Sequence, residues 1–182
     1  MILMPLKELT HEILDAFSKK NQKKMRKTND KILEALMLSF SKPLFRLAVI
    51  SYVLSKILAK PRFYGRAYKE AFERMAQVLA HMERSAGNAE EYGIAADNLA
   101  ETIGQMESED PRFVKSLMEK GKLKTAAILY AQGTSLSLAA EETGISKQDI
   151  MDYSGKTMMA DRVAEAIGIS ERVKRAKKFF GG

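Results

Sequence analysis

The stretch Leu136–Tyr153, LSLAAEETGISKQDIMDY, has the residue spacing of two short helices joined by a tight turn. Ala140 supplies a small side chain where the two helices would cross, and Gly144 follows four positions later. Glycine adopts a positive φ at the lowest cost, so the chain is expected to turn there. Ile145 would fill the corner of the turn, and Ser146 stands where an N-terminal helix cap belongs.

The second of these helices has an apolar face of its own. Ile150 and Tyr153 lie about one turn apart and would face back onto the first helix. Together with the turn, they predict a helix-turn-helix whose second helix reads DNA or RNA. The alternative is a tight helical hairpin inside a helical protein that does not touch nucleic acid.

The rest of the chain is also predicted to be helical, because apolar residues recur at intervals of three and four and no alternating run appears. A first helix begins at about Leu6 and can continue through the basic cluster that follows it. Asn29 or Asp30 would cap a second helix. A third helix has Pro43 in its first turn, runs to about Ala59 and is apolar on most sides, so we expect it at the centre of a bundle.

Two more helices complete the predicted bundle. One covers about residues 67–84, and the next is acidic, with its inward positions in near-heptad spacing. These inward positions are Tyr92, Ala95, Ala96, Leu99, Ile103 and Met106. Ser108 would cap a short helix that Gly121 ends. We therefore predict two domains, a helical bundle over 1–107 and a helix-turn-helix-containing region over 108–182.

Three short helices are predicted in succession in the C-terminal region. They cover 123–132, which Gly133 closes, then 135–143 and 146–154. Three such helices make the trihelical core that a helix-turn-helix needs. The predicted fold is therefore all-α, with an N-terminal helical bundle followed by a C-terminal trihelical helix-turn-helix region.

Composition narrows the possible chemistry. Cysteine is absent and histidine occurs only as His11 and His81, so we expect no disulfide, no metal site and no cofactor. The most apolar run, 44–58, contains polar residues and falls short of the roughly 20 residues of a membrane span. The first residues include Glu8 and offer no small-residue cleavage site, so we expect no signal peptide. Together with the short apolar run, this leads us to expect no membrane association and a cytoplasmic location.

The net charge of +7 is unevenly distributed along the chain. Residues 1–82 hold 16 basic and 7 acidic side chains. Residues 83–110 hold one basic and eight acidic side chains, and residues 111–182 hold 13 basic and eight acidic ones. Two basic clusters stand out: Lys19, Lys20, Lys23, Lys24, Arg26 and Lys27, then Arg172, Lys174, Arg175, Lys177 and Lys178. Both polyanion binding and solvated helix faces fit such clusters, and the overall charge does not choose between them.

The candidate nucleic-acid contacts lie on the second helix of the motif and in the C-terminal basic cluster. Gln148 could read adenine through two hydrogen bonds, and Lys147 could contact guanine or a phosphate. Asp149 and Asp152 would repel phosphates, and Lys156 can neutralise Asp152 only if the helix extends that far. The full set of candidate contacts is Ser146, Lys147, Gln148, Met151, Lys156, Arg172, Lys174, Arg175, Lys177 and Lys178.

One enzymatic pattern is present. Arg74 and His81 are separated by six residues, which resembles the Arg-x6-His motif of the all-α HEPN ribonucleases, where the two side chains assist cleavage at the RNA 2′-hydroxyl. Met75 stands where those enzymes usually carry a polar residue. The other interpretation is two solvated side chains on one helix face. We predict no enzymatic activity; as an alternative, a ribonuclease would bring Arg74 and His81 together in a cleft.

Residues 129–153, LYAQGTSLSLAAEETGISKQDIMDY, resemble the small helix-turn-helix antitoxins that are paired with PIN-type toxins in bacteria and archaea. In those proteins a helix ending in glycine precedes SLxxAAExxGIS and a reading helix. The resemblance implies DNA binding near Ser146–Asp152, autoregulation and dimers. This chain departs from that group by its additional bundle and by its two aspartates. As a whole it also resembles an uncharacterised archaeal helical family.

We therefore predict a nucleic-acid-binding regulatory protein, with DNA favoured over RNA as the target. The bundle would serve oligomerisation or partner binding, and the chain is expected to form a homo-oligomer. The first alternative is a helical interaction or assembly module without enzymatic activity. In that case the outward face of the second motif helix would be buried against another protein.

Overall fold

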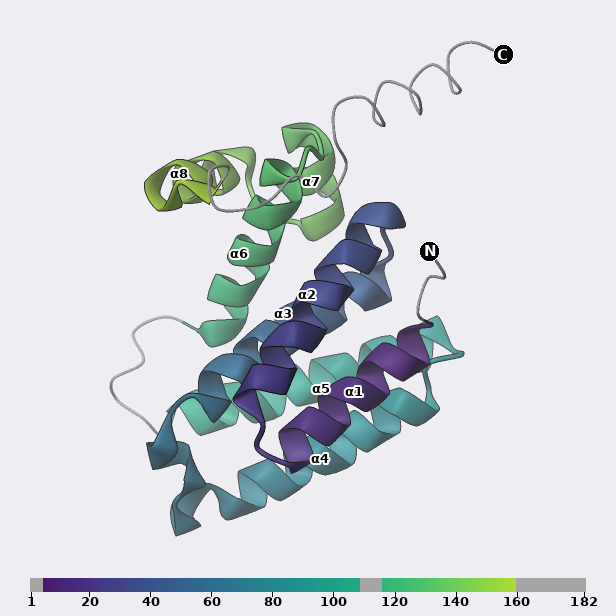
Figure 1. The fold of residues 1–182 in the computed structure, drawn as a ribbon, viewed down its shortest axis with the longest axis vertical. Helices are drawn as coiled ribbons and strands as arrows, with labels where there is room; N and C mark the ends of the chain where they lie inside the picture. Colours follow the sequence, from purple (N-terminus) through teal and green to yellow (C-terminus); the bar gives the residue numbers. More distant parts are fainter. Residues whose placement is uncertain (1–4, 109–115, 160–182) are drawn as a thin grey trace. The chain divides into compact units, whose positions relative to one another are not determined.

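The structure is a computed structural model that describes residues 5–108 and 116–159 of the chain. Within these ranges every regular element is helical, which confirms the predicted all-α class (Figure 1). The elements are α1 (Leu6–Ser18), α2 (Gln22–Leu38), α3 (Lys42–Leu58), the short 3₁₀ helices η1 (Pro61–Tyr64) and η2 (Arg66–Tyr68), α4 (Lys69–Arg84), α5 (Ala89–Ser108), α6 (Leu117–Ala131), α7 (Leu136–Thr143) and α8 (Lys147–Thr157).

The chain divides into two compact units, Met1–Thr125 and Ala126–Gly182. The division falls within α6, so the first part of this helix belongs to one unit and its end to the other. The predicted domains, 1–107 and 108–182, place their boundary earlier in the chain, before α6 begins.

The first unit is built around α3. Twelve of its 17 residues are buried, as its apolar character predicts. Both α2 and α5 pack against α3, while α1 packs against α2, α3 and α4 (Figure 1). Ser41 caps α3 by accepting the N–H of Leu44, and Pro43 lies in the first turn as expected. A buried central helix therefore organises the others.

The helix α5 carries the apolar stripe that the sequence predicts. All six inward positions are buried: Tyr92, Ala95, Ala96, Leu99, Ile103 and Met106. The hydroxyl of Tyr92 lies 2.9 Å from that of Thr10 on α1, and burial raises the pKa of Tyr92 above its ordinary value. Arg46 of α3 donates to the Gly93 carbonyl at 2.6 Å and to Asp97 at 2.9 Å. α5 is thus tied to both α1 and α3.

The start of α2 differs from the prediction. α1 ends at Ser18 instead of continuing through the basic cluster, and Asn21 caps α2 by accepting the N–H of Lys24 at 2.9 Å. Asn29 and Asp30, the predicted caps, lie inside α2. The amide of Asn29 instead donates to a carbonyl and a hydroxyl of α3 at 2.9 and 2.7 Å. Asn29, which we expected to cap a helix, therefore forms its hydrogen bonds with a neighbouring helix.

The helix α6 also differs from the prediction, because it continues through Gly121. A Cβ at this position would lie 3.1 Å from a methyl group of Val53 and 3.2 Å from one of Val49. Gly121 therefore permits the close approach of α6 to α3 and does not end a helix. Ser108, predicted to cap the following helix, is the last residue of α5.

The second unit has a small core in the part that the structure describes. Ala126 of α6, Ala139 of α7 and Ile150 of α8 are fully buried there. Partly buried side chains pack against them, namely Tyr130, Leu136, Ala140 and Ile145. Ala140, the small residue expected at the helix crossing, packs against this core beside the fully buried Ala139.

Candidate nucleic-acid interface

The turn between α7 and α8 is fixed by its local sequence. Gly144 has φ +72°, in the left-handed region, and its N–H donates to the Ala140 carbonyl at 2.9 Å. A residue with a Cβ adopts this region at a cost of roughly 1–2 kcal/mol. Ile145 follows and packs against the small core. The glycine predicted to turn the chain has the expected backbone conformation.

Ser146 begins α8 through two hydrogen bonds with one residue. Its Oγ accepts the N–H of Asp149 at 3.1 Å and donates to the Asp149 carboxylate at 2.6 Å. The carboxylate lies in the first turn of the helix, where the helix dipole stabilises a negative charge. Asp149 therefore supports the helix start, a role that we missed by treating it only as a repulsive charge. The serine-to-acid spacing of three, typical of a capping box, was the available signal.

The predicted contact residues of α8 are exposed. Ile150 and Ser154 are buried and hold the helix against its unit, whereas Met151 is 48% exposed. The exposed candidates are Ser146, Lys147, Gln148, Met151 and Lys156. The structure thus places all five on the outside of one helix or at its cap.

The second aspartate of α8 is hydrogen-bonded to a candidate reading residue. Oδ1 of Asp152 accepts from the Nε2 of Gln148 at 2.7 Å. Because α8 extends to Thr157, Lys156 lies on the same helix, yet the described residues include no ion pair between Lys156 and Asp152. The amide nitrogen of Gln148 carries two hydrogens, so one N–H and the Oε1 oxygen remain for other partners while Asp152 accepts the other N–H.

The other predicted contacts lie outside the described residues. They are Arg172, Lys174, Arg175, Lys177 and Lys178.

The N-terminal basic cluster lies at the turn between α1 and α2 and along the first half of α2. Nζ of Lys19 and of Lys24 lie 2.6 and 2.7 Å from the carboxylate oxygens of Asp15. The ammonium groups of Lys19 and Lys24 lower the pKa of Asp15 from 3.8 to about 2. Part of this positive charge is therefore compensated within the bundle.

The two residues of the ribonuclease-like pattern lie on α4. Arg74 is exposed, and Nε2 of His81 lies 3.8 Å from a carboxylate oxygen of Glu91 on α5. The structure thus gives His81 an acidic neighbour from the bundle. The prediction of no enzymatic activity, with a ribonuclease as the alternative, is not tested by this arrangement.

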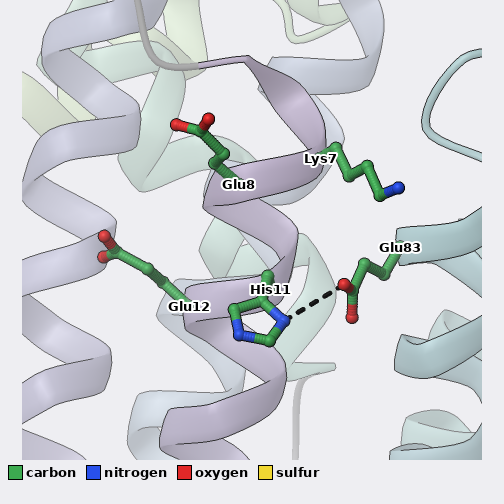
Figure 2. Close-up of a pocket in the computed structure, with 5 residues that line it drawn as sticks. All are labelled: Lys7, Glu8, His11, Glu12 and Glu83. Carbon is green, nitrogen blue, oxygen red and sulfur yellow. Dashed lines mark hydrogen bonds and ion pairs between the residues drawn. The ribbon is translucent and has the colours of Figure 1, made fainter.

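A shallow hollow of about 380 Å³ lies between α1 and α4 and is lined by Lys7, Glu8, His11, Glu12 and Glu83. Nδ1 of His11 lies 3.1 Å from a carboxylate oxygen of Glu83, whereas Figure 2 shows Glu8 and Glu12 pointing away from this pair. Glu12 instead accepts from Lys31 of α2 at 2.8 Å. Among the described residues, no group of three or more histidine or acidic side chains is placed to hold a metal ion. We interpret the pair as a surface link between two helices.

Sequence reasoning also missed a segment that joins α3 to α4. Residues 60–69, KPRFYGRAYK, alternate basic and aromatic side chains and contain no acid. The structure folds this segment into η1, η2 and the first residue of α4. Interleaved basic and aromatic residues are typical of surfaces that bind single-stranded nucleic acid, so the signal was present in the sequence.

Comparison with protein-family models, with curated proteins and with solved structures gave no match to this chain. The resemblance of residues 129–153 to antitoxins therefore stays a prediction. None of the described helices offers an apolar stretch of the length that a bilayer crossing requires.

Proposed function

We propose that this protein binds nucleic acid, with duplex DNA as the expected target, through a helix-turn-helix made by α7 and α8 after α6. The observation that carries the proposal is the turn itself: Gly144 is left-handed, Ser146 caps α8, and Ile150 anchors α8 in a small core. The residues at the start of α8 remain exposed. In a helix-turn-helix, the N-terminal residues of the second helix contact base edges in the major groove.

The exposed side chains suit this role chemically. The amide of Gln148 can pair with adenine, and the ammonium of Lys147 can contact guanine or a phosphate. The carboxylate of Asp152 opposes binding through its charge, and it accepts one of the two N–H groups of the Gln148 amide. Phosphate contacts would then fall largely to basic residues elsewhere, including the predicted set between 172 and 178.

A regulatory role follows from this architecture as part of the proposal. The bundle would provide oligomerisation or a partner surface, and the helix-turn-helix would carry the DNA contacts. The resemblance of 129–153 to antitoxins supports regulation of transcription or of a toxin-like partner.

The second candidate is a protein-interaction module, because apolar side chains are exposed on the same unit. Leu138 of α7 is 46% exposed and Met151 of α8 is 48% exposed. In this interpretation the outward face of α8 packs against a protein and does not enter a groove.

Fluorescence anisotropy tests the proposal on the full-length protein. A duplex enriched from a random-sequence library is titrated at salt concentrations from about 50 to 200 mM, where log affinity should fall linearly with log salt. Lys147→Ala combined with Gln148→Ala should weaken binding to the enriched duplex by about 1–3 kcal/mol, the size of a lost base contact. If Lys147 contacts a phosphate, its loss should also reduce the slope of log affinity against log salt concentration by about one.

The matched control is Lys122→Ala combined with Gln77→Ala, which removes an exposed lysine and an exposed glutamine from α6 and α4. This control should bind the duplex like the unchanged protein. Equal binding by both double variants would contradict the assignment of α8 as the reading helix. It would favour the interaction module.

A further inference from the structure

The basic and aromatic segment 60–69 borders a hollow of about 390 Å³ on the first unit. Residues from the end of α1, from the turn that follows it, from η1 and from α4 line the hollow, including Lys20, Tyr64, Lys69 and Phe72. A volume of this size is within the range of small-ligand sites. The lining therefore offers room for one planar group beside positive charge.

Two aromatic rings form one wall of the hollow. Tyr64 and Phe72 meet edge to face with ring centroids 5.8 Å apart, and Phe72 stacks on Phe17 at 5.2 Å. The hydroxyl of Tyr64 donates to the Leu58 carbonyl at 2.5 Å, which fixes the ring. Tyr64 is nevertheless 38% exposed. A fixed and accessible ring is what base stacking requires.

Lys20 lies over these rings. Its Nζ is 4.8 Å from the centroid of Tyr64 and 5.9 Å from that of Phe72. The backbone of Lys20 has φ +50°, a region that lysine adopts infrequently. An exposed cation–π contact is weak, so the ammonium can move to a phosphate while a base takes its place on the ring.

Other positive charges surround the hollow. Lys69 lines it, and Arg62 and Arg66 are exposed on the adjoining η1 and η2. Glu73 is the acidic member of the lining, and its carboxylate lies 3.8 Å from Nζ of Lys69. The balance of charge is positive and extends beyond the hollow along 60–69.

We propose that this hollow is a second nucleic-acid site, which binds single-stranded nucleic acid by stacking one base on Tyr64. Lys20 and Lys69 would hold the adjacent phosphates, and the arginines of η1 and η2 would follow the strand. Stacked bases of a duplex cannot reach the ring, which favours a single strand. A free nucleotide would contact only the hollow and would not reach the basic residues of η1 and η2. The site lies within the first unit and does not rest on the proposed function of α8.

Photo-crosslinking tests the site directly on the full-length protein. The probe is a thymidine dodecamer with a single 5-iodouracil at its centre, and the crosslinked residue is mapped by mass spectrometry. We expect the crosslink at Tyr64 or Phe72. Crosslinks found only outside the hollow would overturn the proposal, because a strand held by basic residues alone has no reason to stack there.

Three variants then separate stacking from charge. Tyr64→Leu should weaken binding of the dodecamer by about tenfold, the effect of losing one stacked base. Tyr64→Phe keeps the ring and should bind within about twofold of the unchanged protein. Lys20→Gln should lower the salt slope by about 0.7, the value for one phosphate of a single strand. Lys7→Gln replaces an exposed lysine on α1 and is the control. It should change neither the affinity for the dodecamer nor the dependence of that affinity on salt.

The results also distinguish this site from α8 and from a nucleotide pocket. Lys147→Ala combined with Gln148→Ala should leave the crosslink at Tyr64 unchanged, whatever it does to duplex binding. Unchanged affinity of Tyr64→Leu for the dodecamer would overturn the proposal. Displacement of the dodecamer by an equal concentration of thymidine monophosphate would overturn it as well, since the hollow would then be a site for free nucleotides.

Discussion

The two compact units of this protein are stabilised in different ways. In Met1–Thr125, large side chains such as Leu54, Phe63 and Met75 are fully buried around the central helix. In the described part of the other unit, a small buried cluster consists of two alanines and Ile150, and Leu129 and Met159 are further buried apolar side chains. Apolar burial scales with area, so it stabilises the bundle far more than the small helical unit.

In the smaller unit, backbone geometry and a helix cap add to the limited apolar burial. A left-handed glycine, Gly144, and two hydrogen bonds between the Ser146 hydroxyl and Asp149 set the direction of α8. Because few side chains of α8 are buried, most remain available at the surface. The comparison teaches that a helix can be held in place by its turn and one anchor, whereas the bundle is held by a large buried core.

The largest expected effect comes from breaking the core of the bundle. Leu54→Ala removes a fully buried side chain of α3 and should lower the free energy of unfolding by about 2–5 kcal/mol. Urea unfolding followed by circular dichroism measures this change. A loss under about 1 kcal/mol would contradict the central role given to α3.

Ile150→Ala breaks the smaller core, and its effect should be local. The variant loses the one large side chain in that buried cluster, at a cost of about 2–4 kcal/mol to the docking of α8. Hydrogen exchange should show faster exchange of amides in α7 and α8, with amides of α3 unchanged. Equal acceleration in α3 would mean that the two units do not respond separately.

Two glycines of the second unit sharpen the comparison, because only one has a special backbone conformation. Gly144→Ala should destabilise α7 and α8 by roughly 1–2 kcal/mol, since alanine is strained at positive φ. Gly155→Ala, in the exposed part of α8 with open space around it, should stabilise the helix by about 0.5–1 kcal/mol. Thermal melts show whether each variant is more or less stable than the unchanged protein. A change in stability in the same direction for both variants would disprove the role assigned to the turn.

The smallest effect concerns Asp15, whose pKa is lowered from 3.8 to about 2 by Lys19 and Lys24. A carboxylate with a lowered folded-state pKa stabilises the protein above about pH 4, and this contribution disappears as pH falls toward 2. Asp15→Asn should therefore be slightly less stable than the unchanged protein at pH 7, with the difference vanishing near pH 2. Urea unfolding across this pH range measures it. A constant difference would mean that the ion pairs do not titrate as proposed.

Local signals in the sequence predicted the turn between α7 and α8 and the cap of α8 best. Gly144 and Ser146 act through backbone geometry and nearby hydrogen bonds, which depend on few other residues. The buried stripe of α5 was also predictable, since helical spacing alone places Tyr92 and Leu99 on one face. Of the candidate contacts, the five around α8 are exposed as expected, whereas their hydrogen bonds to Asp149 and Asp152 were not foreseen.

Signals that depend on a distant neighbour were misread. Gly121 looks like a helix end, but its lack of a side chain serves contact with Val49 and Val53 of α3. Asn29 looks like a cap, but its amide binds α3. In both cases the deciding partner lies far away in sequence, and periodicity carries no information about it.

Hydrogen exchange with and without duplex DNA at about 50 mM salt is the most direct measurement of the central claim, because it locates the bound surface as well as detecting binding. We expect slower exchange of amides in the turn and in the first half of α8, around Ser146–Asp152, when the duplex is present. If exchange there is unchanged while the duplex is bound elsewhere on the chain, α7 and α8 have only a structural role and do not contact DNA.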